Sequence, residues 1–120
     1  MIVVFNWPHR ALFPNARNGK HWGSFQQHKV KARNDGYLFT RSAIKQPNIK
    51  GERVPLHITF YAPDGRRRDI DGMLGAMKHH IDGMAKALGV DDSVFRPVVL
   101  DVKLDEKKEG YVMMKVGEGE

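Results

Sequence analysis

The stretch VPLHITFYAPDGRRRDIDGMLGAMKHHIDGMAKALG, residues 54–89, decides the fold, because a strand pattern in it changes to a helix pattern. In Val54 to Ala62, apolar and polar residues alternate, and Leu56, Ile58 and Phe60 fall on one side. Alternation of this kind predicts a half-buried β-strand. A Pro-Asp-Gly turn follows it directly.

Farther along the stretch, apolar residues recur at steps of three and four, which predicts a helix from about Asp71 to Leu88. One face of that helix is expected to pack in the core through Leu74, Met77, Ile81, Met84 and Leu88. Gly89 predicts where the helix ends, because glycine readily adopts the left-handed conformation of a C-terminal cap.

Shorter patterns flank this stretch on both sides. Residues 1–7 form an apolar run that predicts an edge strand. Residues 24–44 predict a helix with Ser24 as its N-cap. Residues 96–104 and 111–116 predict two strands that a charged turn joins as a hairpin.

The chain of 120 residues fits a single domain over residues 1–120, of the α+β class, with a mixed β-sheet and two main helices. No apolar run approaches the roughly 20 residues that span a bilayer, and no basic leader precedes the first apolar run. Cysteine is absent, which excludes a disulfide framework and a thiolate zinc site. We therefore expect a cytoplasmic protein with no membrane partner.

The charge balance indicates a polyanionic partner. Lys and Arg number 20 against 14 Asp and Glu, a net charge of +6, and the isoelectric point is near 9.7. Lys and Arg neutralise phosphates and release counterions, so nucleic acid is the usual partner of such a chain. The alternative is a basic protein whose charge serves solubility alone.

Two acidic residues, Asp69 and Asp71, stand two positions apart just before the predicted helix. In an extended segment alternate side chains point to the same side, so both carboxylates can face one hard cation such as Mg²⁺. The other interpretation makes the first Asp only a helix N-cap. The three residues before them could offset the charge repulsion and contact the DNA backbone: Arg66, Arg67 and Arg68.

More charged residues follow on the helix and after it. Lys78 extends back toward the acidic start of the helix, where it could stabilise charge on a phosphate or orient a water. Its alternative is an exposed pair with Asp82 four residues on. Asp91 and Asp92 come after the helix stop. They could supply the third carboxylate that two-metal phosphodiester hydrolysis needs, or be merely solvated.

The order of these motifs resembles the RusA family of Holliday junction resolvases: RRDxD, then K-x-x-x-D-G on the helix, then a Gly stop and DDS. The resemblance spans nearly the whole chain, including a Pro-Asn-Ala-Arg loop near the N-terminus. It implies a homodimer that binds four-way DNA junctions and resolves them by paired nicks, in DNA recombination and repair. Mg²⁺ is the implied cofactor, with Mn²⁺ as a substitute. Two active sites on a two-fold axis would suit the symmetry of a junction.

The same resemblance implies a catalytic set of three metal-binding carboxylates, one lysine and one supporting acid: Asp69, Asp71 and Asp92, then Lys78, and Asp91. The chain departs from the usual family pattern at Gly72, where an Asn is common. Its lysine also comes one turn later than in the best-known members.

The spacing of the acids sets a geometric condition. A straight helix from Asp71 to Leu88 is about 26 Å long, which would leave Asp92 far from the first two acids. Either the helix is shorter or bent near Gly75 or Gly83, or the partner subunit supplies the third carboxylate.

Other basic and polar residues are candidates for DNA contact. The full DNA-binding set is Asn15, Arg17, Lys20, Lys29, Lys31, Arg66, Arg67 and Arg68. Six histidines are scattered without a zinc-binding spacing, which favours oxygen ligands for the metal. Two other functions are kept open: a catalytically weak or inactive nucleic-acid-binding protein of the same fold, and an RNA-binding domain with no active site.

Overall fold

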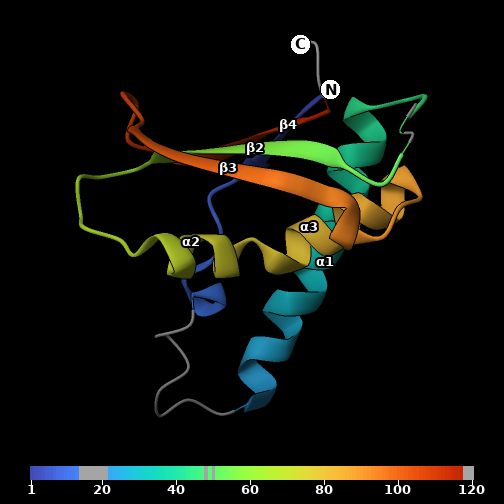
Figure 1. The fold of residues 1–120 in the computed structure, drawn as a ribbon. Helices are drawn as coiled ribbons and strands as arrows, with labels where there is room; N and C mark the ends of the chain where they lie inside the picture. The colour runs from blue at the N-terminus through green and yellow to red at the C-terminus, as the bar shows by residue number, and fades with distance from the viewer. Residues whose placement is uncertain (14–21, 48, 50, 118–120) are drawn as a thin grey trace.

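The computed structural model describes residues 1–13, 22–47, 49 and 51–117. The elements are β1 (Ile2–Asn6), η1 (Arg10–Leu12), α1 (Trp22–Ala43), β2 (Val54–Ala62), α2 (Ile70–Ala76), α3 (Lys78–Leu88), η3 (Asp92–Val94), β3 (Phe95–Leu104) and β4 (Tyr111–Val116). Figure 1 shows α2 and α3 lying beneath the sheet and α1 crossing beside α3. The α+β class and the mixed sheet are confirmed, but the described residues hold three α-helices where two were predicted.

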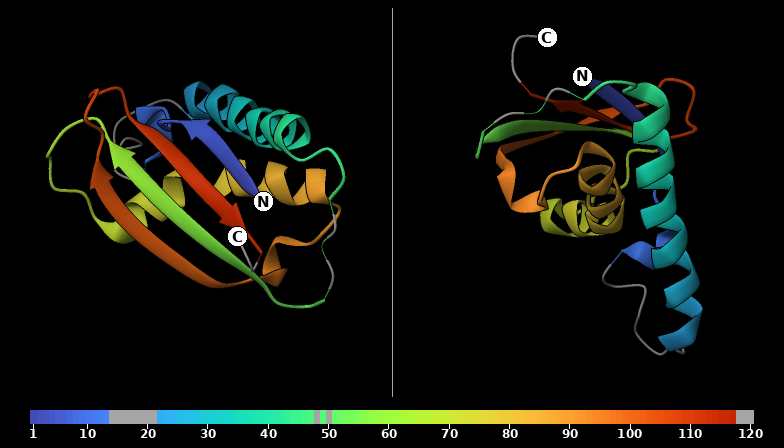
Figure 2. Two further views of the ribbon diagram at one scale, coloured as in Figure 1. Left: turned by 90° about the horizontal axis from the view of Figure 1, so that it is seen from above. Right: turned by 90° about the vertical axis from the view of Figure 1, so that its right-hand side faces the viewer.

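The four strands lie in the order β1-β4-β2-β3, so the predicted hairpin of β3 and β4 is wrong (Figure 2). β2 stands between them, parallel to β3 and antiparallel to β4. The connection from β3 to β4 is fixed to the end of β2, because Asp105 donates its backbone N–H to the Ala62 carbonyl at 2.8 Å. The buried Asp105 carboxylate also accepts three backbone N–H groups, from Lys107, Glu109 and Gly110. This turn carries the chain across the end of β2, so β4 pairs on the other side of it.

Helices cover one face of the sheet, and the other face is open (Figure 1). Leu56, Ile58 and Phe60 of β2 are fully buried on the covered face, as their alternation predicted. Met77 and Met84 pack in the same core. None of the helices in the described residues is long and apolar enough to cross a membrane.

The predicted helix from Asp71 to Leu88 is wrong in one respect, because it is divided at Met77 into α2 and α3. The Met77 N–H bonds to the Leu74 carbonyl three residues back, which tightens and ends α2. Full burial of the Met77 side chain accompanies this break. Leu74, predicted to be in the core, is 37% exposed, because α2 lies at the margin of the sheet. Gly89 ends α3 in the left-handed conformation, φ 73°, as predicted.

α1 begins at Trp22, so Ser24 lies inside the first turn and the prediction that it is the N-cap is wrong. The helix crosses α3 at two glycines, Gly36 and Gly83. A methyl group on Gly36 would overlap the carbonyl oxygen of His80, and one on Gly83 would overlap that of Arg33. A glycine in the middle of α1 is therefore explained by the contact of two helix backbones. The N-terminal half of α1 projects away from the sheet (Figure 2).

Candidate functional site

The first acidic group lies at the start of α2. Asp69 occupies the N-cap position with an extended backbone (φ −74°, ψ 139°), but its carboxylate makes no capping hydrogen bond. Asp71 lies in the first turn, and its Oδ1 accepts the N–H of Gly72 at 3.0 Å. Both acids are exposed. The carboxylate of Asp69 does not serve as the cap of the helix, so it can accept a ligand from outside.

The three arginines before this group have different environments. Arg68 is turned inward, where Nη2 contacts Oδ1 of Asp64 at 2.8 Å and the guanidinium lies 5.2 Å from the Trp7 ring. The pKa of Asp64 is lowered, first by the backbone N–H of Arg66 and then by Arg68. Arg66 and Arg67 are exposed. Of the three predicted DNA-contact arginines, these two have exposed side chains and Arg68 does not.

A second acidic group consists of Asp82, in the middle of α3, and of Asp91 and Asp92 at the start of η3. The neighbouring carboxyl group of Asp82 raises the pKa of Asp92, because two adjacent carboxylates cannot both ionise easily. Asp91 also raises it. Oδ1 of Asp91 accepts the N–H of Ser93 at 2.9 Å, and this bond lowers the pKa of Asp91. Asp91 therefore holds the start of η3 in place.

Asp82 was not among the predicted site residues. The signal that could have found it is its place four residues after Lys78 in the K-x-x-x-D-G motif. Nζ of Lys78 lies 3.5 Å from Oδ2 of Asp82, and the lysine side chain is 65% exposed. Lys78 is thus paired with the second acidic group, as the alternative interpretation of the sequence had it, and is not directed back toward Asp71.

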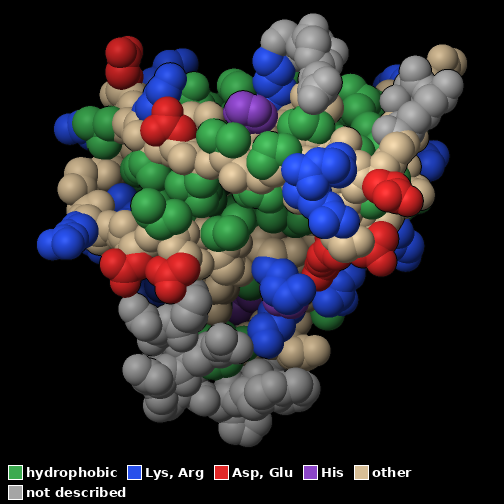
Figure 3. Space-filling view, viewed as in Figure 1, with side chains coloured by type: hydrophobic (Ala, Val, Ile, Leu, Met, Phe, Trp, Pro, Cys, Tyr) green, Lys and Arg blue, Asp and Glu red, His purple; other side chains and the backbone are tan. Residues whose placement is uncertain are grey.

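The two acidic groups stand at opposite ends of the α2–α3 segment (Figure 1). Among the acidic side chains in Figure 3, one group lies over α2 and a separate one lies on the opposite side of the view, near α3. Among the residues that the structure describes, no three His, Cys, Asp or Glu side chains are placed to hold a metal ion. Asp69 and Asp71 therefore both lie at the start of α2, while Asp92 lies apart from them, near Asp82.

Three of the predicted DNA-contact residues precede α1 in the sequence, and two lie on the helix. Asn15, Arg17 and Lys20 lie outside the described residues. Lys29 is half-buried, while Lys31 is exposed and pairs with Asp35 at 2.7 Å. Of the two predicted residues on α1, Lys31 is therefore the exposed one.

An exposed apolar surface lies between the two acidic groups, which we call the β3–α2 face: Val98, Val102, Leu104, Ile70 and Leu74. β3 is an edge strand of the described sheet, so one side of its backbone has no strand beside it. Val102 is 42% exposed, Leu104 57% and Ile70 65%. Figure 3 shows hydrophobic side chains gathered between the sheet and α2. Exposed apolar surface on a long edge strand is typical of a protein interface.

No known family model matches the chain. The chain is 37% identical over 105 residues to a protein of Xylella fastidiosa (strain Temecula1 / ATCC 700964) that is described as an uncharacterized protein. The matched region covers 82% of this chain and 66% of that protein, so the chain spans just under two thirds of its relative's length. The description of that protein states no activity.

Proposed function

We propose that this protein is a Mg²⁺-dependent, structure-specific endonuclease that binds four-way DNA junctions as a homodimer and resolves them by paired nicks, in recombination and repair. One observation carries the proposal: two exposed carboxylate groups flank an unpartnered apolar edge strand. The resemblance of the motifs to the RusA family and the net charge of +6 support it.

In a two-fold symmetric dimer whose subunits pair through β3, the second acidic group of one subunit would lie near the first acidic group of the other. β3 starts at Phe95, directly after Asp92–Val94. It ends at Leu104, which lines one shallow pocket together with Arg66 and Ile70. If two β3 strands pair antiparallel about a two-fold axis, the start of one lies beside the end of the other. Asp92 of one copy would then approach Asp69 and Asp71 of its partner.

The residues of such a composite site suit a hard divalent cation, since carboxylate oxygens are the ligands that Mg²⁺ prefers. When bound, Mg²⁺ supplies charge stabilisation and makes water a better nucleophile. Asp69, Asp71 and Asp92 would hold the ion. Arg66 and Arg67 would contact the DNA phosphates, and Lys78 would offset negative charge near the third acid through its pair with Asp82.

The decisive experiment incubates the protein with a labelled four-way junction, with and without Mg²⁺. We expect cleavage only with Mg²⁺, and a loss of about 100-fold or more in the rate for Asp92→Asn, because a ligand is removed. Glu106→Gln, which changes an exposed acid in the β3–β4 turn, is the matched control and should cleave normally.

Two results would go against this proposal. Binding without cleavage by the unmodified protein would replace the enzyme with the alternative, a nucleic-acid-binding protein of the same fold that is catalytically weak or inactive. Equal cleavage by Asp92→Asn would remove that residue from the metal site.

The dimer is tested by a charge on the β3–α2 face. We expect Val102→Glu to convert the dimer to a monomer, because a charged side chain without a partner would be buried in an apolar contact. Sedimentation equilibrium measures the mass. Val4→Glu, on the exposed side of the opposite edge strand β1, is the control and should stay dimeric. A monomeric unmodified protein, or a dimeric Val102→Glu variant, would rule out this interface.

A further inference from the structure

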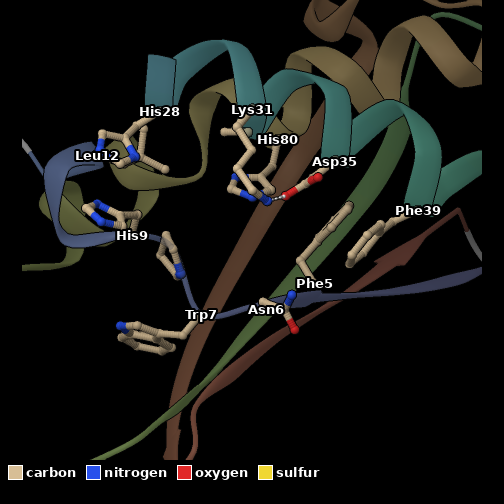
Figure 4. Close-up of a pocket in the computed structure, with 12 residues that line it drawn as sticks. Phe5, Asn6, Trp7, His9, Leu12, His28, Lys31, Asp35, Phe39 and His80 are labelled. Atoms are coloured by element: carbon tan, nitrogen blue, oxygen red, sulfur yellow. Dashed lines mark hydrogen bonds and ion pairs between the residues drawn. The ribbon is translucent and has the colours of Figure 1, made fainter. Parts of the chain in front are cut away.

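A cavity of about 370 Å³ lies between β1, η1 and α1 (Figure 4), and neither acidic group lines it. Ligand pockets begin at about 300 Å³, so it suits one small ring system. Aromatic and imidazole rings form much of its lining, with a few polar groups at the rim. The rings belong to Phe5, Trp7, Phe39, His9, His28 and His80.

His80 is a buried polar group without a partner in this cavity. It is 6% exposed, and its Nδ1 has no hydrogen-bond partner among the described residues. Burial lowers its pKa to about 4, so the ring is neutral at pH 7 and one nitrogen donates while the other accepts. Figure 4 places the ring beside Lys31 and Asp35. A buried polar atom of this kind is costly unless a ligand satisfies it.

Asp35 supplies a hydrogen-bond acceptor at the same place. Its Oδ2 contacts Nζ of Lys31 at 2.7 Å, while Oδ1 has no donor among the residues that the structure describes. Asn6, an exposed residue of β1, adds an amide to the lining. An ionised carboxylate accepts hydrogen bonds but does not donate them, so the ligand's edge should carry a donor such as an amino group.

The rings offer surfaces for stacking. His9 and His28 lie face to face, with centroids 3.8 Å apart, at one side of the cavity. Phe5 and Phe39 are stacked at 5.8 Å on the side toward α1. Lys31, at the rim, brings positive charge to whatever phosphate accompanies a ligand. Flat apolar walls, N–H acceptors and a nearby cation together suit a nucleotide.

We infer that this cavity holds an unpaired nucleobase with an exocyclic amino group, extruded from the DNA strand that the protein binds. The inference rests on the proposed function, because the nuclease would bring the strand to the cavity. The base would stack on the rings, and its amino group would donate to Asp35. A branched DNA offers bases that leave their stack at low cost, which makes such a contact possible.

The test titrates the protein with three probes by calorimetry: deoxyguanosine 5′-monophosphate, thymidine 5′-monophosphate and deoxyribose 5-phosphate. We expect the first to bind, the second to bind about five- to tenfold more weakly because thymine has no amino group, and the sugar phosphate not to saturate. Asp35→Ala should weaken the first about tenfold. Asp101→Ala, an exposed acid on β3, should leave it unchanged.

Equal binding of all three probes, or no binding of deoxyguanosine monophosphate at millimolar concentration, would overturn the inference. Cleavage of four-way junctions is assayed on the same preparations. Cleavage by a protein that binds no nucleotide would leave the nuclease and overturn the base site alone. Nucleotide binding that Asp35→Ala weakens, in a protein that cuts no junction, would support the base site and overturn the nuclease.

Discussion

A mixture of Asp69→Asn and Asp92→Asn chains is expected to nick four-way junctions although neither variant does so alone. In a composite site, Asp69 of one copy works with Asp92 of the other. A mixed dimer then has one site in which both residues are substituted and one in which both are intact. The intact site should cut one strand, so the product is a nicked junction and not two resolved duplexes.

The measurement refolds the two variants together and separates nicked from resolved junctions on a native gel. The control is a mixture of Asp69→Asn with Asp71→Asn chains, which changes two residues of the same acidic group. In that mixture each site has one defect, so no activity should return. Inactivity of the first mixture, with the unmodified protein active, would mean that Asp92 acts within its own chain.

Gly83→Ala is expected to destabilise the fold by about 3 kcal/mol or more, since overpacking against an immovable backbone is among the costliest core changes. The added methyl group would overlap the carbonyl oxygen of Arg33, an atom of the α1 backbone that cannot rotate away. α1 and α3 would have to separate along their crossing. Urea unfolding at fixed protein concentration measures the loss.

Gly72→Ala is the matched control for this change. It is also a helix glycine, but a methyl group there meets only Cβ of Asp69, at an ordinary 3.9 Å. Helix propensity alone should make this variant equal to the unmodified protein or up to about 1 kcal/mol more stable. A Gly83→Ala variant as stable as the control would contradict the close crossing of the two helices.

The sequence predicted the elements that depend on local patterns. β2 was predicted with its bounds, because the alternation of Leu56, Ile58 and Phe60 needs only neighbours along the chain. The stop at Gly89 was predicted for the same reason. The hairpin was wrong because strand order depends on a distant contact, the bond from Asp105 to Ala62, which no local pattern contains.

In the candidate site, too, the sequence predicted what depends on local spacing and missed what depends on contacts between distant residues. Asp69 and Asp71 were predicted from their spacing, and both are exposed at the start of α2. Asp71 lies in the first helical turn, however, and not in the extended segment that the spacing argument assumed. The approach of Asp82 to Asp92 was missed, since it depends on how the chain turns back after Gly89 and places η3 against α3. The direction of Lys78 was equally undecided, because a lysine can reach either way along a helix.

The position of β4 inside the sheet affects how the chain folds during its synthesis. Residues 111–116 form an inner strand, with β1 on one side and β2 on the other. While the ribosome still holds these residues in its exit tunnel, β1 has no partner in the sheet and β2 can pair only with β3. β1 therefore cannot join the sheet until residues 111–116 have been synthesised and have left the tunnel. Such late, long-range pairing slows folding and leaves apolar strands exposed in the nascent chain, where chaperones would be expected to bind them.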